Sequence, residues 1–106
     1  MGWVVEVLAV ADEEVRSLPE DMQARFRHIV ELIQVKGLEQ MREPHVKHLE
    51  GKLWEMRMTG RDGISRAIYV RAKGQRVVVV RVFVKKTEKT PRSEIEIALR
   101  RAQEVR

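Results

Sequence analysis

Residues 77–84 constrain the fold of this chain more than any other segment. They comprise six valines and one phenylalanine, interrupted only by Arg81. β-Branched and aromatic residues favour strands, and a run that is apolar on both faces predicts a strand buried inside a sheet. A cation within such a strand requires a partner, whether a carboxylate, a carbonyl group or the phosphate of a ligand.

Two adjacent lysines, Lys85 and Lys86, end this strand. Their ammonium groups repel one another unless an anion lies between them. The segment therefore predicts a rigid strand that holds two positive charges at one point. We expect this end of the strand to be a functional surface.

The rest of the chain divides into short elements with recognisable boundaries. Residues 19–36 predict a long helix with Pro19 in its first turn and Gly37 after its end. The apolar face of this helix is predicted to carry Met22, Phe26, Ile29, Val30 and Ile33. The other expected elements are a strand over Trp3–Val10, a brief helix from Asp12, a loop over Leu38–Pro44, strands over Val46–Met58, Ile64–Ala72 and Arg76–Val84, and a final helix after Pro91.

These elements predict one α+β domain over residues 1–106. We expect a twisted antiparallel sheet, made of a C-terminal three-stranded meander and the N-terminal strand. Two N-terminal helices and one C-terminal helix are expected to pack against it.

Composition excludes several classes of protein. The chain has no cysteine, which excludes disulfides and thiolate chemistry. At 43% hydrophobic and 35% charged residues it is globular, and it has no apolar run long enough to cross a membrane. The first residues lack the basic leader of a signal peptide, so we expect a cytoplasmic protein.

Positive charge is concentrated in the second part of the chain. Residues 1–41 hold four Lys or Arg against eight Asp or Glu, whereas residues 42–106 hold 17 against eight. This asymmetry predicts that the second part meets a polyanion, the alternative being a solvated basic surface without a target. Because only five residues are aromatic, contact with phosphates is more consistent with the sequence than base stacking.

Other catalytic and metal-binding patterns receive little support. No phosphate-binding glycine loop or hydrolase motif is present. His45 and His48 lie three residues apart near Glu50, a spacing that can hold a metal, but no further ligands accompany them, and we expect no metal and no cofactor. Glu50 and Glu55 are expected to pair with neighbouring arginines or lysines.

The remaining candidates are a set of cations on the predicted meander: Arg57, Arg66, Arg81, Lys85 and Lys86. Adjacent strands lie about 4.8 Å apart, so cations on one face can converge on a single phosphate. The alternative for each arginine is an exposed edge charge or an ion pair.

Four segments together resemble the phage-derived HigB-like toxins of the RelE/ParE superfamily. These segments are Leu53-Trp54-Glu55-Met56-Arg57, Arg66-Ala67-Ile68-Tyr69, Val82 to Pro91 and Glu94 to Ala98. The stretch Phe83-Val84-Lys85-Lys86-Thr87-Glu88-Lys89-Thr90-Pro91 is the most specific part. The resemblance extends over nearly the whole chain and implies the RelE-like fold.

The resemblance also implies a function and its residues. It implies the toxin of a type II toxin–antitoxin system, an endoribonuclease that cleaves mRNA on the 70S ribosome without a metal. A helix-turn-helix, HigA-like antitoxin is the implied partner, and no membrane is involved. The implied catalytic residues are Arg57 and Arg66, which clamp phosphate, and Lys85 and Lys86, whose proximity lowers the proton affinity of one of them. Substrate contacts are assigned to Tyr69, Arg81, Phe83 and Lys89.

Two alternatives remain open from the sequence. One is a ParE-like gyrase inhibitor with the same fold, against which the lysine pair favours RNA cleavage. The other is a noncatalytic nucleic-acid-binding regulatory module that uses the same basic face. The C-terminal segment has no histidine or aspartate, so the residue that moves protons during cleavage is not identified.

Overall fold

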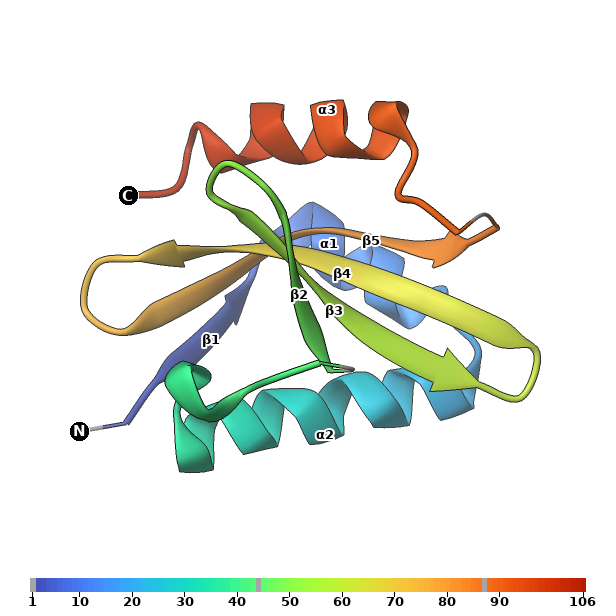
Figure 1. Ribbon diagram of the computed structural model, residues 1–106, viewed down its shortest axis with the longest axis horizontal. Coiled ribbons are helices and arrows are strands. Elements are labelled where there is room, and N and C mark those ends of the chain that lie inside the picture. The colour runs from blue at the N-terminus through green and yellow to red at the C-terminus, as the bar shows by residue number, and fades with distance from the viewer. Residues whose placement is uncertain (1, 44, 87) are drawn as a thin grey trace.

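A five-stranded sheet with helices on both faces forms the centre of the computed structural model, which describes residues 2–43, 45–86 and 88–106 (Figure 1). In chain order the elements are β1 (Val4–Val7), α1 (Ala9–Arg16), α2 (Glu20–Lys36), the 3₁₀ turn η1 (Leu38–Gln40), β2 (Val46–Glu50), β3 (Leu53–Gly60), β4 (Gly63–Ala72), β5 (Arg76–Lys85) and α3 (Arg92–Ala102). The strand order across the sheet is β1-β5-β4-β3-β2. The predicted α+β class and its three helices are confirmed.

The sheet differs from the expected one in two respects. The segment predicted as one strand over Val46–Met58 is a hairpin, because the chain reverses at Gly51 and Lys52, and Glu50 pairs with Leu53. Gly51 has a φ of +54°, which suits a tight turn. In addition, β1 runs parallel to β5, so only the four strands β2–β5 form an antiparallel meander.

The N-terminal strand is also shorter than predicted. The expected strand over Trp3–Val10 ends at Val7, and α1 begins at Ala9, before the acidic residues that were expected to open it. Similarly, the loop expected over Leu38–Pro44 contains η1, while Pro44 lies outside the described residues.

Two hydrophobic clusters hold the three layers together. The first joins α1 and α2 to one face of the sheet and includes four of the five residues predicted for the apolar face of α2, which are Met22, Phe26, Ile29 and Ile33, with Val30 packed at its margin. The second joins α3 to the opposite face, through Ile95, Ala98 and Ala102 (Figure 1). None of the described helices is long and apolar enough to cross a bilayer.

The close approach of α2 to β3 depends on Gly60. A Cβ at this position would lie 2.8 Å from Met22 Cγ and 2.9 Å from Asp21 Oδ2. The backbone N–H of Arg61 donates a hydrogen bond to Asp21 Oδ2 at 2.6 Å. The first turns of α2 are therefore fixed against the end of the β3–β4 hairpin.

Candidate functional site

Strand register places four of the predicted site residues on the face that α3 covers: Arg57, Arg66, Phe83 and Lys85. Arg57 pairs with Arg66, and Arg66 pairs with Phe83, so these side chains form one row across β3, β4 and β5. Lys85 pairs with Ile64 in the next row. Because side chains two residues apart share a face, Lys85 and Phe83 lie on the same side of β5.

The α3 helix leaves this end of the sheet open. Its cluster extends along β4 and β5 through Ile68, Val70, Val78 and Val80 and ends at Phe83, which is 9% exposed. Arg57 and Lys85 lie beyond this cluster and are partly exposed. Phe83 thus forms the apolar wall between the α3 core and an open, positively charged end of the sheet.

Arg66 is the exception in this row, because it is buried and already paired. Its Nη1 forms an ion pair with Glu55 and donates to Thr90 Oγ1 at 2.7 Å, while Nη2 donates to the carbonyl oxygen of Glu88 at 3.1 Å. Thr90 Oγ1 in turn donates to Glu55 Oε1 at 2.7 Å. The side chains of Arg66 and Glu55 are 4% and 2% exposed.

In this arrangement the guanidinium group of Arg66 contacts protein groups, whereas the sequence resemblance implied that it clamps phosphate. Its two terminal nitrogens anchor the segment that connects β5 to α3, and its buried Nε has no hydrogen-bond partner among the described residues. The expectation that Glu55 and Glu50 pair with basic residues is confirmed, since Glu50 accepts a hydrogen bond from Arg92 at 2.7 Å. Sequence reasoning missed Thr90 as the bridge, because its partner Glu55 is 35 residues away.

The surroundings of Lys85 alter the acidity of its side chain. Partial burial lowers the pKa of its ammonium group, and the positive charges of Arg66 and Arg57 lower it further, against the opposing effect of Glu88 and Glu55. The sequence predicted such a shift with Lys86 as its cause. Lys86 does not contribute because it follows the strand end and is exposed, whereas the two arginines share the face of Lys85.

The segment after Lys85 lies above this end of the sheet. Lys86, Glu88 and Lys89 are exposed, and Thr87, part of the most specific stretch of the sequence, lies outside the described residues. The arrangement presents Arg57 and Lys85 at one open surface over a buried Arg66–Glu55 ion pair, and the exposed Lys86 follows directly after the strand end. Chemically, it can bind an anion and exchange a proton through Lys85.

Tyr69 and Arg81, predicted as substrate contacts, are not brought to this surface. Tyr69 is 1% exposed and belongs to the cluster on the opposite face, since it alternates with Arg66 and Ile68 along β4. Burial raises the pKa of its hydroxyl.

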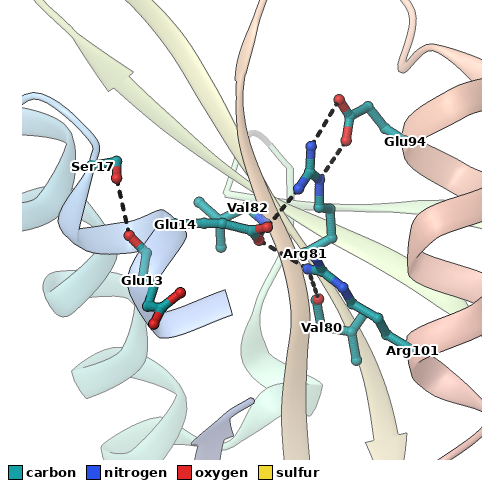
Figure 2. A network of polar contacts seen from close by, with 8 residues as sticks. All are labelled: Glu13, Glu14, Ser17, Val80, Arg81, Val82, Glu94 and Arg101. Atoms are coloured by element: carbon teal, nitrogen blue, oxygen red, sulfur yellow. Dashed lines mark hydrogen bonds and ion pairs between the residues drawn. The ribbon is translucent and has the colours of Figure 1, made fainter. Parts of the chain in front are cut away.

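The partner that Arg81 requires consists of two carboxylates. Arg81 Nη1 lies 2.5 Å from Glu14 Oε2 on α1, and Arg81 Nε lies 2.5 Å from Glu94 Oε1 on α3 (Figure 2). Glu14 Oε1 also accepts hydrogen bonds from the Val82 N–H and from Arg101, both at 3.0 Å. This network ties both helical layers to the edge of β5, so we assign Arg81 a structural role.

The network makes stability depend on pH. Burial alone raises the pKa of Glu14, but hydrogen bonds from Arg101 and the Val82 N–H and the charge of Arg81 outweigh it, so the net pKa is lowered. The stabilisation by ionised Glu14 is therefore complete above its usual pKa of 4.5 and is lost as the pH falls through the lower native value.

We expect Glu14→Gln to lower the free energy of unfolding at neutral pH by about 1.5–3 kcal/mol, the usual range for hydrogen bonds to charged groups. The difference from the wild type should shrink below pH 4.5. Urea unfolding at both pH values measures it. Glu13→Gln is the matched control, because Glu13 is exposed and its substitution removes the same charge from the same helix. Equal losses in the two variants would contradict the network's role.

The histidine pair is divided between two environments. His48 Nε2 donates to the carbonyl oxygen of Gly51 at 2.7 Å, and its ring meets Trp54 edge-on at 4.9 Å. His45 lies just before β2 and takes no part in these contacts. No group of three or more potential metal ligands occurs in the described part of the chain.

Comparison with known proteins identifies the family. Residues 13–103 match the family described as phage-derived protein Gp49-like. The chain belongs to this family. No curated protein matches it.

A solved structure has the same fold. A mutant of the E. coli toxin RelE in the free state superposes with a TM-score of 0.67, over 95% of this chain and 98% of that chain. Sequence identity is 16%, so the similarity establishes the RelE fold alone. It agrees with the fold that the sequence resemblance implied.

Proposed function

We propose that this Gp49-like chain is the HigB-like toxin of a type II toxin–antitoxin system and cleaves mRNA on the ribosome. The observation that carries the proposal is the open end of the sheet, where Lys85, with its lowered pKa, shares one face with Arg57. The RelE fold and the phage-derived family support it.

In the proposed reaction, the 2′-oxygen of a nucleotide attacks the adjacent phosphorus. The bond from phosphorus to the 5′-oxygen breaks, leaving a 2′,3′-cyclic phosphate, and the departing 5′-oxygen takes up a proton. Neutral Lys85 accepts the proton of the 2′-hydroxyl, a role that its lowered pKa favours. Arg57 and Lys86 stabilise the growing phosphate charge.

The other residues of the site shape it. Phe83 walls the site on the α3 side, and Lys89 lies on the segment that borders it. Arg66 acts as a positioning residue, because it holds this segment in place through Glu88 and Thr90.

Silencing of the toxin requires a partner that covers this surface. Because residues 42–106 carry an excess of nine positive charges (17 Lys or Arg against eight Asp or Glu), we propose that the helix-turn-helix antitoxin presents acidic side chains to it. A cytoplasmic location follows from the proposed target.

The proposal is tested with purified chain and ribosome-bound mRNA. We expect RNA fragments with 2′,3′-cyclic phosphate ends, also in the presence of a chelator. In cells, we expect induction to arrest growth, and we expect co-expression of a helix-turn-helix protein encoded by the adjoining reading frame to relieve the arrest. Arrest with intact mRNA and inhibited gyrase would favour the ParE-like alternative. Salt-sensitive RNA binding without cleavage or arrest would favour a regulatory module.

A further inference from the structure

A second cluster of basic side chains surrounds a hollow at the outer edge of β3. The hollow has a volume of about 190 Å³ and is lined by Arg25, His45, Arg57 and Thr59. Arg25 comes from α2, His45 precedes β2, and Arg57 and Thr59 belong to β3. Each of these residues has a side chain that can donate a hydrogen bond, and none is a carboxylate.

The hollow lies at the part of β3 that extends beyond the start of β2. Val46, the first residue of β2, pairs with Met56, so β3 has no strand partner on this side from Arg57 to Gly60. The N–H of Arg57 donates to the carbonyl oxygen of His45 at 2.9 Å, which places the His45 backbone beside Arg57. Figure 1 shows that α2 passes beside the start of β2, which brings Arg25 to the same edge.

The arginines of the hollow have no protein partner among the described residues. Six other arginines pair with carboxylates: Arg16, Arg66, Arg76, Arg81, Arg92 and Arg101. Arg42 donates to carbonyl oxygens, and Arg71 lies over the ring of Trp3. Within the part of the chain that the structure describes, no ion pair or side-chain hydrogen bond involves Arg25 or Arg57, and the same holds for the side chains of Arg27, Arg61, Arg100 and Arg106.

A second hollow has a different charge balance. Its lining contains two carboxylates beside two arginines, although no ion pair joins them among the described residues: Glu20, Asp21, Gln23, Ala24, Arg27 and Arg61. Arg25 and Arg57 face no such compensation. Two arginines without a carboxylate on the lining of one hollow favour an anion that can accept several hydrogen bonds, and phosphate has that geometry.

Arg57 connects this hollow to the proposed cleavage site. Its charge acts on Lys85 at the open end of the sheet, and Arg57 is also one of the residues that line the hollow at the edge of β3. A chain of phosphates can therefore run from the open face of the sheet around the edge of β3 towards α2. Successive nucleotides of a single-stranded RNA supply such a chain of phosphates.

We propose that Arg25, His45, Arg57 and Thr59 form a second phosphate subsite, which binds a backbone phosphate of single-stranded RNA flanking the one at Lys85. This inference rests on the proposed function, in which RNA is the substrate. It assigns a binding role to Arg25 and His45, outside the cleavage site itself.

The test compares Arg25→Gln with Arg27→Gln. Both residues are exposed arginines of α2, and Arg27 belongs to the hollow that contains carboxylates. The probe is a short oligouridylate with 2′-O-methyl groups, which binds but cannot be cleaved, titrated at several salt concentrations. Arg25→Gln should weaken binding several-fold and reduce the salt slope by about 0.7, the value for one phosphate of a single strand. Arg27→Gln should leave both close to the wild type.

Each outcome of the titration decides the proposal. Equal effects of the two variants, or no binding of the oligouridylate by the wild type, would overturn the subsite. The subsite would also be overturned if Arg25→Gln weakened the binding of a poly-glutamate peptide but not of the oligouridylate. The hollow would then be assigned to an acidic protein segment. Arg25-dependent RNA binding by a chain that cleaves no mRNA would refute the proposed nuclease and leave the subsite standing.

Discussion

Replacing Arg66 with alanine is expected to destabilise the protein by about 3–5 kcal/mol, the cost of leaving one partner of a buried ion pair alone. Glu55, whose side chain is 2% exposed in the native protein, would keep only Thr90 Oγ1 of its present side-chain partners. A loss of this size is a large part of the stability of a domain of this length. Urea unfolding of the purified variant measures it.

A double variant distinguishes the loss of the Arg66–Glu55 ion pair from a general loss of packing. Glu55→Leu with Arg66→Met removes both charges and keeps apolar volume, and such replacements are often neutral or stabilising. We therefore expect the double variant to recover most of the stability that Arg66→Ala loses. A loss below about 1 kcal/mol in Arg66→Ala would instead place the pair in a surface-like environment. Arg66 would then be free to clamp phosphate, as the sequence resemblance implied.

The stability of Arg66→Ala also determines whether its activity carries information on catalysis. If Arg66→Ala unfolds a large fraction of the protein, the loss of growth arrest carries no information on catalysis. Thr90→Val is the more informative variant, because it removes the hydroxyl that bridges Arg66 and Glu55 while keeping the shape of the side chain. It tests whether the placement of the segment after β5 matters for cleavage.

Local patterns in the sequence predicted most of the fold. The apolar spacing of α2 and the valine-rich run of β5 identified both elements, because each depends on its own residues. The turn at Gly51 was missed since the apolar residues continue on both sides of it. The parallel pairing of β1 with β5 joins residues about 70 positions apart, and no local pattern encodes it.

Strand periodicity predicted which site residues share a face of the sheet, but not the other features of the site. Arg57, Arg66 and Lys85 share one face of the meander, as expected from strand alternation. Which cations are neutralised was not predictable, because Glu14 meets Arg81 from 67 residues away. The hollow at the edge of β3 was missed for the same reason, since Arg25 and His45 approach Arg57 only in the folded chain.

Lys85→Ala is expected to lower the rate of mRNA cleavage by about 10²–10³-fold, within the range seen when a general base or a donor to developing charge is removed. The fold should survive, because Lys85 lies at a strand end and is partly exposed. Lys73→Ala is the matched control, as it removes an exposed lysine from the turn at the other end of the β4–β5 hairpin. Single-turnover rates on ribosome-bound mRNA, with circular dichroism of each variant, measure the effect.

The pH dependence of the same rate distinguishes a proton acceptor from a mere positive charge. If neutral Lys85 accepts the proton of the 2′-hydroxyl, the wild-type rate rises with pH until Lys85 is deprotonated. Arg57→Gln removes one of the charges that lower the pKa of Lys85, so its rate should rise at higher pH than that of the wild type. In Lys85→Ala this rise should disappear. A pH profile that is unchanged in both variants would mean that Lys85 only binds the phosphate, and another group would have to move the proton.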